Sequence, residues 1–116
     1  MYDRGIALRT RHVVLIYLWT EIGGARGAVV ASRKVGNSVR RNRAKRLLRT
    51  ARRHALSGAP LANVDHVLVA REGIDRELSR EIDAQVIELY TAAGLLPGIN
   101  RGLVSKVTRD VGDHAP

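Results

Sequence analysis

The most constraining feature of this chain is a long stretch without acidic residues, in which the basic residues gather. No aspartate or glutamate occurs between Glu21 and Asp65, whereas eleven of the chain's twenty lysines and arginines lie in that interval. Charges of one sign repel one another, so a folded segment of this kind needs a polyanionic partner. The net charge of +9 leaves RNA, DNA and acidic membranes as the candidates.

The spacing of these residues predicts an amphipathic helix over about residues 38–56. At about 100° per residue, apolar and basic side chains separate onto two arcs. The apolar arc holds Ala44, Leu47, Leu48, Ala51 and Ala55, and the polar arc holds Arg41, Asn42, Lys45, Arg46, Arg49, Arg52 and Arg53. Arg40 and Arg43 lie at the flanks of the apolar arc. Gly36 supplies a helix breaker, and Asn37 and Ser38 are two candidates for the N-cap.

Further patterns predict a small sheet and a second helix. Residues 13–19 and 28–32 are expected to form a hairpin of two strands around a glycine-rich turn, and residues 66–70 a third strand. Residues 76–93 carry apolar side chains at i+3 and i+4 spacing, from Leu78 to Ala93, which is typical of a helix that packs on a core. Gly94 and Pro97 are expected to end this helix.

These elements predict an α+β fold, a two-layer α/β sandwich with a small mixed sheet and helices on one face. Residues 1–96 are expected to form one domain and residues 97–116 a flexible C-terminal tail. Tyr17 and Trp19 share a strand face with Val13 and Leu15, so we expect them in the core. His12, Val14 and Ile16 are expected on the opposite face.

No pattern indicates a catalytic or metal-binding site. The chain has no cysteine, and its four histidines, at positions 12, 54, 66 and 114, lack the spacing of metal ligands. A nucleophile elbow, a P-loop and a zinc signature are absent from the sequence. The acids between residues 72 and 88 are typical of a solvated helix face. The longest apolar run, residues 13–19, is too short to cross a bilayer, so we expect a cytoplasmic protein without a membrane partner.

The segment from Ser32 to Arg49 resembles the signature of the bacterial ribonuclease P protein component. That signature is an Arg-Asn-Arg core on a helix, entered through a strand that ends in Ser-Lys-Lys-x-Gly-Asn-Ala; here Arg33 replaces a common lysine and Ser38 a common alanine. Residues 65–71 are similar to the family's next strand, which ends in a small residue and an arginine. The resemblance covers residues 1–96, which we therefore identify as a ribonuclease P protein-like RNA-binding domain.

The resemblance implies that the chain is the protein subunit of an endoribonuclease whose chemistry is carried by RNA. Its partners would be the catalytic RNA subunit and the 5′ leader of precursor tRNA, which the ribonucleoprotein removes in tRNA 5′ maturation. Mg²⁺ would be bound by the RNA subunit and substrate, not by protein ligands alone, and no catalytic residues are expected in the protein. Alternatives are a ribosomal or ribosome-assembly RNA-binding protein without a role in cleavage, and a DNA-binding helix module.

The expected RNA-binding residues are Ser32, Arg33, Lys34, Asn37, Arg40, Arg41, Asn42, Arg43, Lys45, Arg46, Arg49, Arg52, Arg53 and Arg71. Arginine forks engage phosphates bidentately, and the Asn42 amide can donate to phosphate or ribose. Asn37 has an alternative role as a helix cap only. Arg71 has an alternative role in solvating a strand end. The face with His12, Val14 and Ile16 would line or underlie a leader-binding groove.

The resemblance also implies a helix at the N-terminus and a left-handed crossover between strands. Family members open with a basic segment and a short helix that ends in a valine, an aromatic residue and a glycine. Tyr2 and Gly5 are similar to the end of that helix, and Met1 stands at the place of its valine. We therefore expect this family helix to be missing from the chain and the true translation start to lie upstream of Met1.

Overall fold

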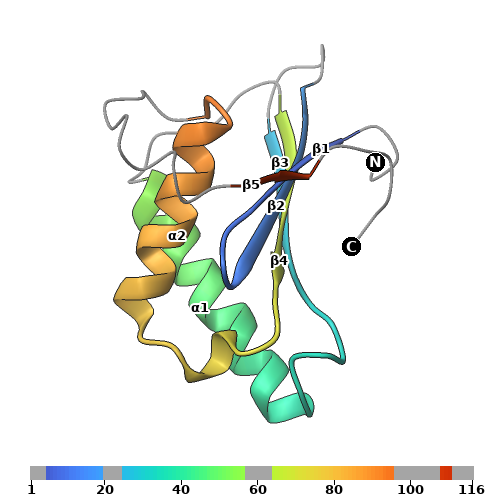
Figure 1. The fold of residues 1–116 in the computed structure, drawn as a ribbon, viewed down its shortest axis with the longest axis vertical. Helices are drawn as coiled ribbons and strands as arrows, with labels where there is room; N and C mark the ends of the chain where they lie inside the picture. Colours follow the sequence, from blue (N-terminus) through green and yellow to red (C-terminus); the bar gives the residue numbers. More distant parts are fainter. Residues whose placement is uncertain (1–4, 20–24, 57–63, 96–107, 111–116) are drawn as a thin grey trace.

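A computed structural model describes residues 5–19, 25–56, 64–95 and 108–110 of the chain. The elements, in chain order, are β1 (Ile6–Arg9), β2 (Val13–Trp19), β3 (Ala25–Ala31), α1 (Ser38–Leu56), β4 (Val64–Ala70), the 3₁₀ turn η1 (Ile74–Arg76), α2 (Ser79–Ala92) and β5 (Thr108–Asp110). Both helices lie on one side of a single sheet (Figure 1). The predicted two-layer α+β sandwich is confirmed.

The sheet has the strand order β3-β4-β2-β1-β5. β4 pairs with β2 antiparallel and with β3 parallel, so the predicted hairpin of β2 and β3 is wrong. The burial of β4 explains its central position. Val64 and Leu68 are buried on the helix side and Val67 and Val69 on the other, as is typical of a central strand. β3 instead carries small and exposed residues, which suit an edge.

Two strands lie where no strand was expected. Ile6–Arg9, which shows no clear pattern in the sequence, forms β1 and pairs antiparallel with β2. Thr108–Asp110, inside the segment expected to be a loose tail, forms β5 on the other edge of β1. The pairing gives backbone partners to an edge of β1 that would otherwise need water. A three-residue strand is too short to produce a period in the sequence.

The main core lies between the helices and the sheet. Val13, Leu15 and Tyr17 of β2 pack there with Leu48 of α1 and Leu89 of α2. Trp19, also expected in the core, is 52% exposed and makes an edge-to-face contact with Tyr17, with ring centroids 6.4 Å apart. The alternation of β2 therefore holds up to Tyr17 and fails at the last residue of the strand.

α2 begins and ends at identifiable signals. The sequence predicts a start at residue 76, but residues 74–76 form η1 and α2 begins at Ser79. Leu78, predicted to lie in the apolar stripe, is instead the exposed N-cap residue. At the other end Gly94 adopts φ +79°. There the Leu95 N–H donates to the Tyr90 carbonyl and the Gly94 N–H to the Thr91 carbonyl. This Schellman arrangement confirms Gly94 as the stop.

Candidate RNA interface

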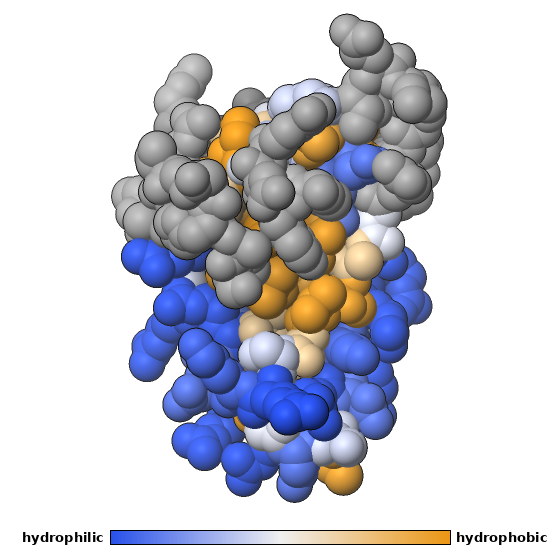
Figure 2. Space-filling model, turned by 90° about the vertical axis from the view of Figure 1, so that its right-hand side faces the viewer, coloured by the Kyte–Doolittle hydropathy of each residue, from blue (hydrophilic) through white to orange (hydrophobic). Residues whose placement is uncertain are grey.

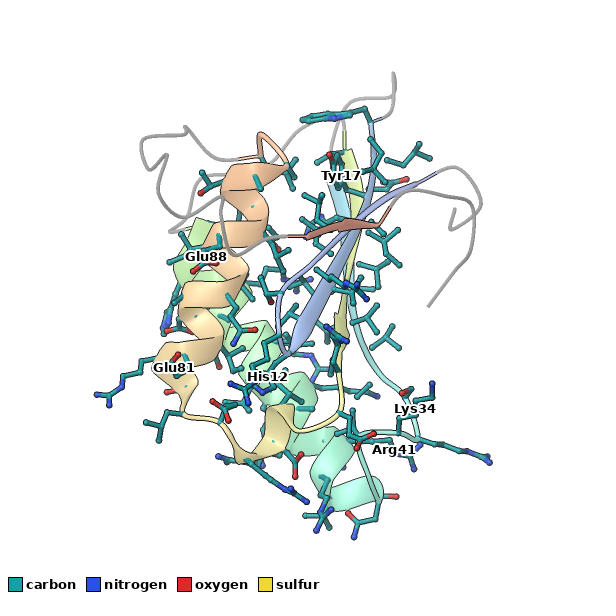
Figure 3. All side chains as sticks on the ribbon, in the orientation of Figure 1. His12, Tyr17, Lys34, Arg41, Glu81 and Glu88 are labelled. Atoms are coloured by element: carbon teal, nitrogen blue, oxygen red, sulfur yellow. The ribbon has the colours of Figure 1, made fainter. Side chains whose placement is uncertain are left out.

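The turn between β3 and α1 presents polar residues of the predicted site. Ser32 Oγ accepts a hydrogen bond from the Lys34 backbone N–H at 3.3 Å. The Val35 side chain is buried, whereas Ser32, Arg33 and Lys34 are exposed. Val35 thus anchors the turn in the core and leaves the two cations in solvent. Figure 3 shows Lys34 and Arg41 at the same end of the molecule.

Asn37 caps the start of α1. Its Oδ1 accepts a hydrogen bond from the Arg40 backbone N–H at 3.0 Å, and its carbonyl accepts one from Arg41 N–H at 2.9 Å. The first turn of α1 contains no acid but does contain Arg40 and Arg41. Cations beside the positive end of a helix dipole cost stability. Such a local cost is expected at a position kept for function.

The two faces of α1 have the predicted phase. Ala44, Leu48 and Ala51 are buried in the core, and Leu47 and Ala55 are partly buried against it. On the polar side, an open hollow of about 490 Å³ is lined by Val39, Asn42, Lys45, Arg46 and Arg49. We call the last four of these residues the outer ridge. It presents amide, ammonium and guanidinium donors on successive helical turns, which suits the phosphates of an extended polyanion.

The cations of the outer ridge are not neutralised by acids of the described segments. No ion pair within residues 5–19, 25–56, 64–95 and 108–110 involves Lys45, Arg46 or Arg49. Arg53, one turn further on, is also exposed. The charges of these side chains are thus not paired with an acid of the described residues.

Arg40 and Arg43, by contrast, contact η1. Arg40 Nε lies 3.8 Å from Asp75 Oδ2, and Arg43 Nε donates a hydrogen bond to the Asp75 carbonyl at 2.8 Å. Both arginines were expected at the flanks of the apolar arc, and η1 lies against that flank. They therefore have a structural contact in addition to their predicted role with RNA.

Arg52 reaches back over the sheet at Gly27. A Cβ built on Gly27 would lie 3.0 Å from Arg52 Nη1 and 2.9 Å from His66 Cε1, so only glycine leaves room for both side chains. His66 is buried, and its Nε2 shares a hydrogen bond of 3.0 Å with the Tyr90 hydroxyl. Burial, aided by the nearby Arg52 charge, lowers the pKa of His66 to about 4. Arg52 thus faces a buried neutral histidine as well as the surface.

His12 lies on the helix side of the sheet, so its predicted position on the opposite face is wrong. Gln85 of α2 fixes it: Gln85 Oε1 accepts hydrogen bonds from Thr10 Oγ1 at 2.8 Å and from His12 N–H at 2.9 Å. The Gln85 amide nitrogen therefore donates to His12 Nδ1, 3.0 Å away. This leaves His12 neutral with its proton on Nε2. Burial lowers the pKa of His12.

Arg71 belongs to the same region. Its guanidinium donates a hydrogen bond to the Thr10 carbonyl at 2.8 Å, and its backbone N–H donates to the His12 carbonyl. The side chain therefore supports the turn between β1 and β2. It comes from the end of β4 and not from the basic helix.

The sheet face away from the helices is apolar. Val14, Ile16, Val67 and Val69 form a second buried cluster there, with Ala7 packed against it. Figure 2 views the molecule from this side and shows hydrophobic side chains at its centre and hydrophilic ones below. Because Val14 and Ile16 are buried, they would underlie a groove on this face and not line it.

Neither a metal centre nor a membrane span is found in the described part of the chain. No three histidine or carboxylate side chains among these residues gather closely enough to hold a metal ion. None of the helices that these residues form is long and apolar enough to cross a bilayer.

Fold and charge together define a small α+β protein with one cationic helix. A family model for ribonuclease P matches residues 1–94, and the chain belongs to the ribonuclease P protein family. It is similar to the ribonuclease P protein component of Pelotomaculum thermopropionicum, at 33% identity over 90 residues, which are 78% of this chain and 80% of that protein. The protein of Geotalea uraniireducens is 38% identical over 85 residues, which are 70% and 73% of the two chains.

Solved structures share the fold. The RNase P protein of Staphylococcus aureus superimposes with a TM-score of 0.70 at 23% identity, over 83% of this chain and 87% of that one. The protein of Thermotoga maritima gives a TM-score of 0.65 at 23% identity, over 76% and 83%.

Sequence reasoning missed Asp75 and Gln85, which hold predicted or nearby residues in place. Asp75 looks like one acid among several in the 72–88 segment, and Gln85 lies between core positions of α2. Their contacts join residues more than thirty positions apart. No local pattern reports such pairings.

Proposed function

We propose that this chain is the protein subunit of a ribonuclease P ribonucleoprotein, which removes the 5′ leader from precursor tRNA. The observation that carries the proposal is the outer ridge, whose three cations are not neutralised by any acid of the described residues. Within the proposal the ridge and the turn at Arg33 and Lys34 bind the catalytic RNA. Membership of the family supports the choice of partner.

Binding of the 5′ leader is assigned to the apolar sheet face that points away from the helices. Val14, Ile16, Val67 and Val69 include no aromatic side chain, so base stacking of the kind seen in aromatic RNA-binding sheets has no platform among them. These buried side chains also offer no donor to a phosphate, so contact with the leader backbone is assigned to the hydrophilic side chains that border the cluster (Figure 2). The proposal has the protein act in the cytoplasm.

The chemical step is assigned to the RNA, with Mg²⁺ held by RNA and substrate phosphates. The protein contributes cations where two RNA molecules approach each other. Clustered arginines and lysines offset phosphate repulsion that divalent ions would otherwise have to screen. The protein is therefore expected to lower the Mg²⁺ concentration at which the RNA cleaves its substrate.

The test compares two double variants that lose the same charge. Arg46→Ala/Arg49→Ala removes ridge cations, and Arg76→Ala/Arg80→Ala removes exposed cations from η1 and α2. Binding to ribonuclease P RNA transcribed from the same genome is measured as a function of salt. Each lost phosphate contact flattens the plot of log affinity against log salt by about 0.7 to 0.9. We expect this flattening in the ridge variant alone.

Equal slopes in the two variants would show that net charge, not the ridge, drives binding. Copurification of the tagged chain separates the proposal from a ribosomal role. Recovery of one large RNA with precursor tRNA supports ribonuclease P. Recovery of ribosomal subunits alone would contradict it.

A further inference from the structure

An acidic residue, Asp75, lies against the N-terminal half of α1, where basic side chains gather. Asp75 belongs to η1, which is anchored by the fully buried Ile74 and closed by hydrogen bonds from Ile74 N–H to the Arg71 carbonyl and from Arg76 N–H to the Gly73 carbonyl. In Figure 1 this short turn lies beside the first half of α1. The position of Asp75 is therefore fixed by the core, independently of any RNA.

One contact fixes the backbone of Arg40, and two further features restrict its side chain. Its backbone is held by the Asn37 cap, and its stem passes over Gly36, where a built Cβ would lie 2.5 Å from Arg40 Cδ. Gly36 has a φ of +144°, which side chains rarely adopt, so this open space is built into the turn. Asp75 Oδ2 then lies 3.8 Å from Arg40 Nε.

The two partners differ in exposure. The Arg40 side chain is 52% exposed and that of Asp75 only 9%. The carboxylate thus lies beneath the guanidinium group, which still reaches solvent. Arg43, one turn along, is fixed by the Asp75 carbonyl through its own Nε. In both arginines the Nε edge faces η1, and the terminal nitrogens are the donors left for a bidentate contact.

We propose that Asp75 is a positioning residue for RNA binding: by holding the Nε edge of Arg40, it aims the terminal nitrogens of that arginine at a backbone phosphate. The inference rests on the proposed function, because it needs RNA as the partner. A side chain that is already ordered loses less conformational entropy when it binds. Asp75 therefore strengthens binding of a polyanion although it carries a negative charge.

The direction in which RNA affinity changes when Asp75 is replaced makes the inference testable. Long-range electrostatics alone predict that removing any acid strengthens RNA binding, since the protein becomes more positive. Positioning predicts the reverse for Asp75→Asn, which keeps the size of the side chain and leaves the backbone carbonyl for Arg43. Glu72→Gln is the matched control, because Glu72 is exposed, lies three residues away and changes the net charge equally.

Affinity for the ribonuclease P RNA is measured for both variants against salt. We expect Asp75→Asn to bind roughly three- to tenfold more weakly than the parent, with a salt slope flatter by about 0.7 to 0.9. Glu72→Gln is expected to bind as well as the parent or better. Asp75→Glu, which restores the carboxylate, should recover part of the affinity. Circular dichroism and thermal melting establish that all variants fold.

Measuring Asp75→Asn in an Arg40→Ala protein separates the loss of Arg40 positioning from general damage to η1. If Asp75 acts through Arg40, Asp75→Asn no longer weakens binding once Arg40 is absent. Equal weakening in both backgrounds, or tighter binding of Asp75→Asn that matches Glu72→Gln, would overturn the inference and leave the proposed function standing. A parent protein without salt-dependent binding to this RNA would overturn both.

Discussion

Acid is expected to destabilise this fold through His66. The neutral ring is buried beside Tyr90 and Arg52, and its pKa falls from 6.5 to about 4 in the folded chain. The unfolded chain therefore binds a proton at a higher pH than the folded chain. The stabilisation is fully present above pH 6.5 and is lost as the pH falls towards about 4. At about 1.4 kcal/mol per unit of pKa, the loss amounts to about 3 kcal/mol.

The assay is urea denaturation at a series of pH values, for the parent and for His66→Gln. The variant keeps a polar side chain near Tyr90 but has no proton to gain. Trp19, the single tryptophan, reports unfolding because it packs edge-on against Tyr17. We expect the free energy of unfolding of the parent, relative to that of the variant, to fall by about 3 kcal/mol across the interval. Parallel pH profiles would refute the reasoning, because the two proteins differ in no titratable group except His66.

Two further substitutions test the structure of α1. Leu48→Ala should lower the free energy of unfolding in urea by about 2 to 5 kcal/mol, and Leu47→Ala by less, because only Leu48 is fully buried; equal losses would mean that the helix phase is wrong. Asn37→Ala should cost about 1 kcal/mol in the same assay, because the Arg40 N–H loses its acceptor. An unchanged midpoint would show that Asn37 does not cap the helix.

The sequence predicts those parts of the molecule that depend on local periodicity. The charges of α1 recur with the helical period, so both its bounds and the outward direction of Arg46 and Arg49 could be predicted. The same holds for Val13, Leu15 and Tyr17, whose alternation within β2 determines the face that meets the helices. Gly94 as the end of α2 follows from its freedom to adopt a positive φ.

The remaining features depend on contacts between distant residues. β3 and β4 pair in parallel although the whole of α1 lies between them in the chain. No residue pattern within β3 predicts this partner. His12 precedes β2, so strand alternation does not apply to it, and Gln85 decides its direction. Arg40 and Arg43 look like their neighbours in the sequence. Only the position of Asp75 separates them from the outer ridge.

The most direct test of the proposed function is multiple-turnover cleavage of precursor tRNA across a series of Mg²⁺ concentrations. The reaction contains ribonuclease P RNA from the same genome, alone, with the parent protein, or with Arg46→Ala/Arg49→Ala. We predict that the parent lowers the Mg²⁺ needed for cleavage and that the ridge variant loses most of this effect. We also predict that protein freed of RNA does not cleave. Metal-dependent cleavage by the protein alone, or a parent protein without effect on the Mg²⁺ requirement, would contradict the account.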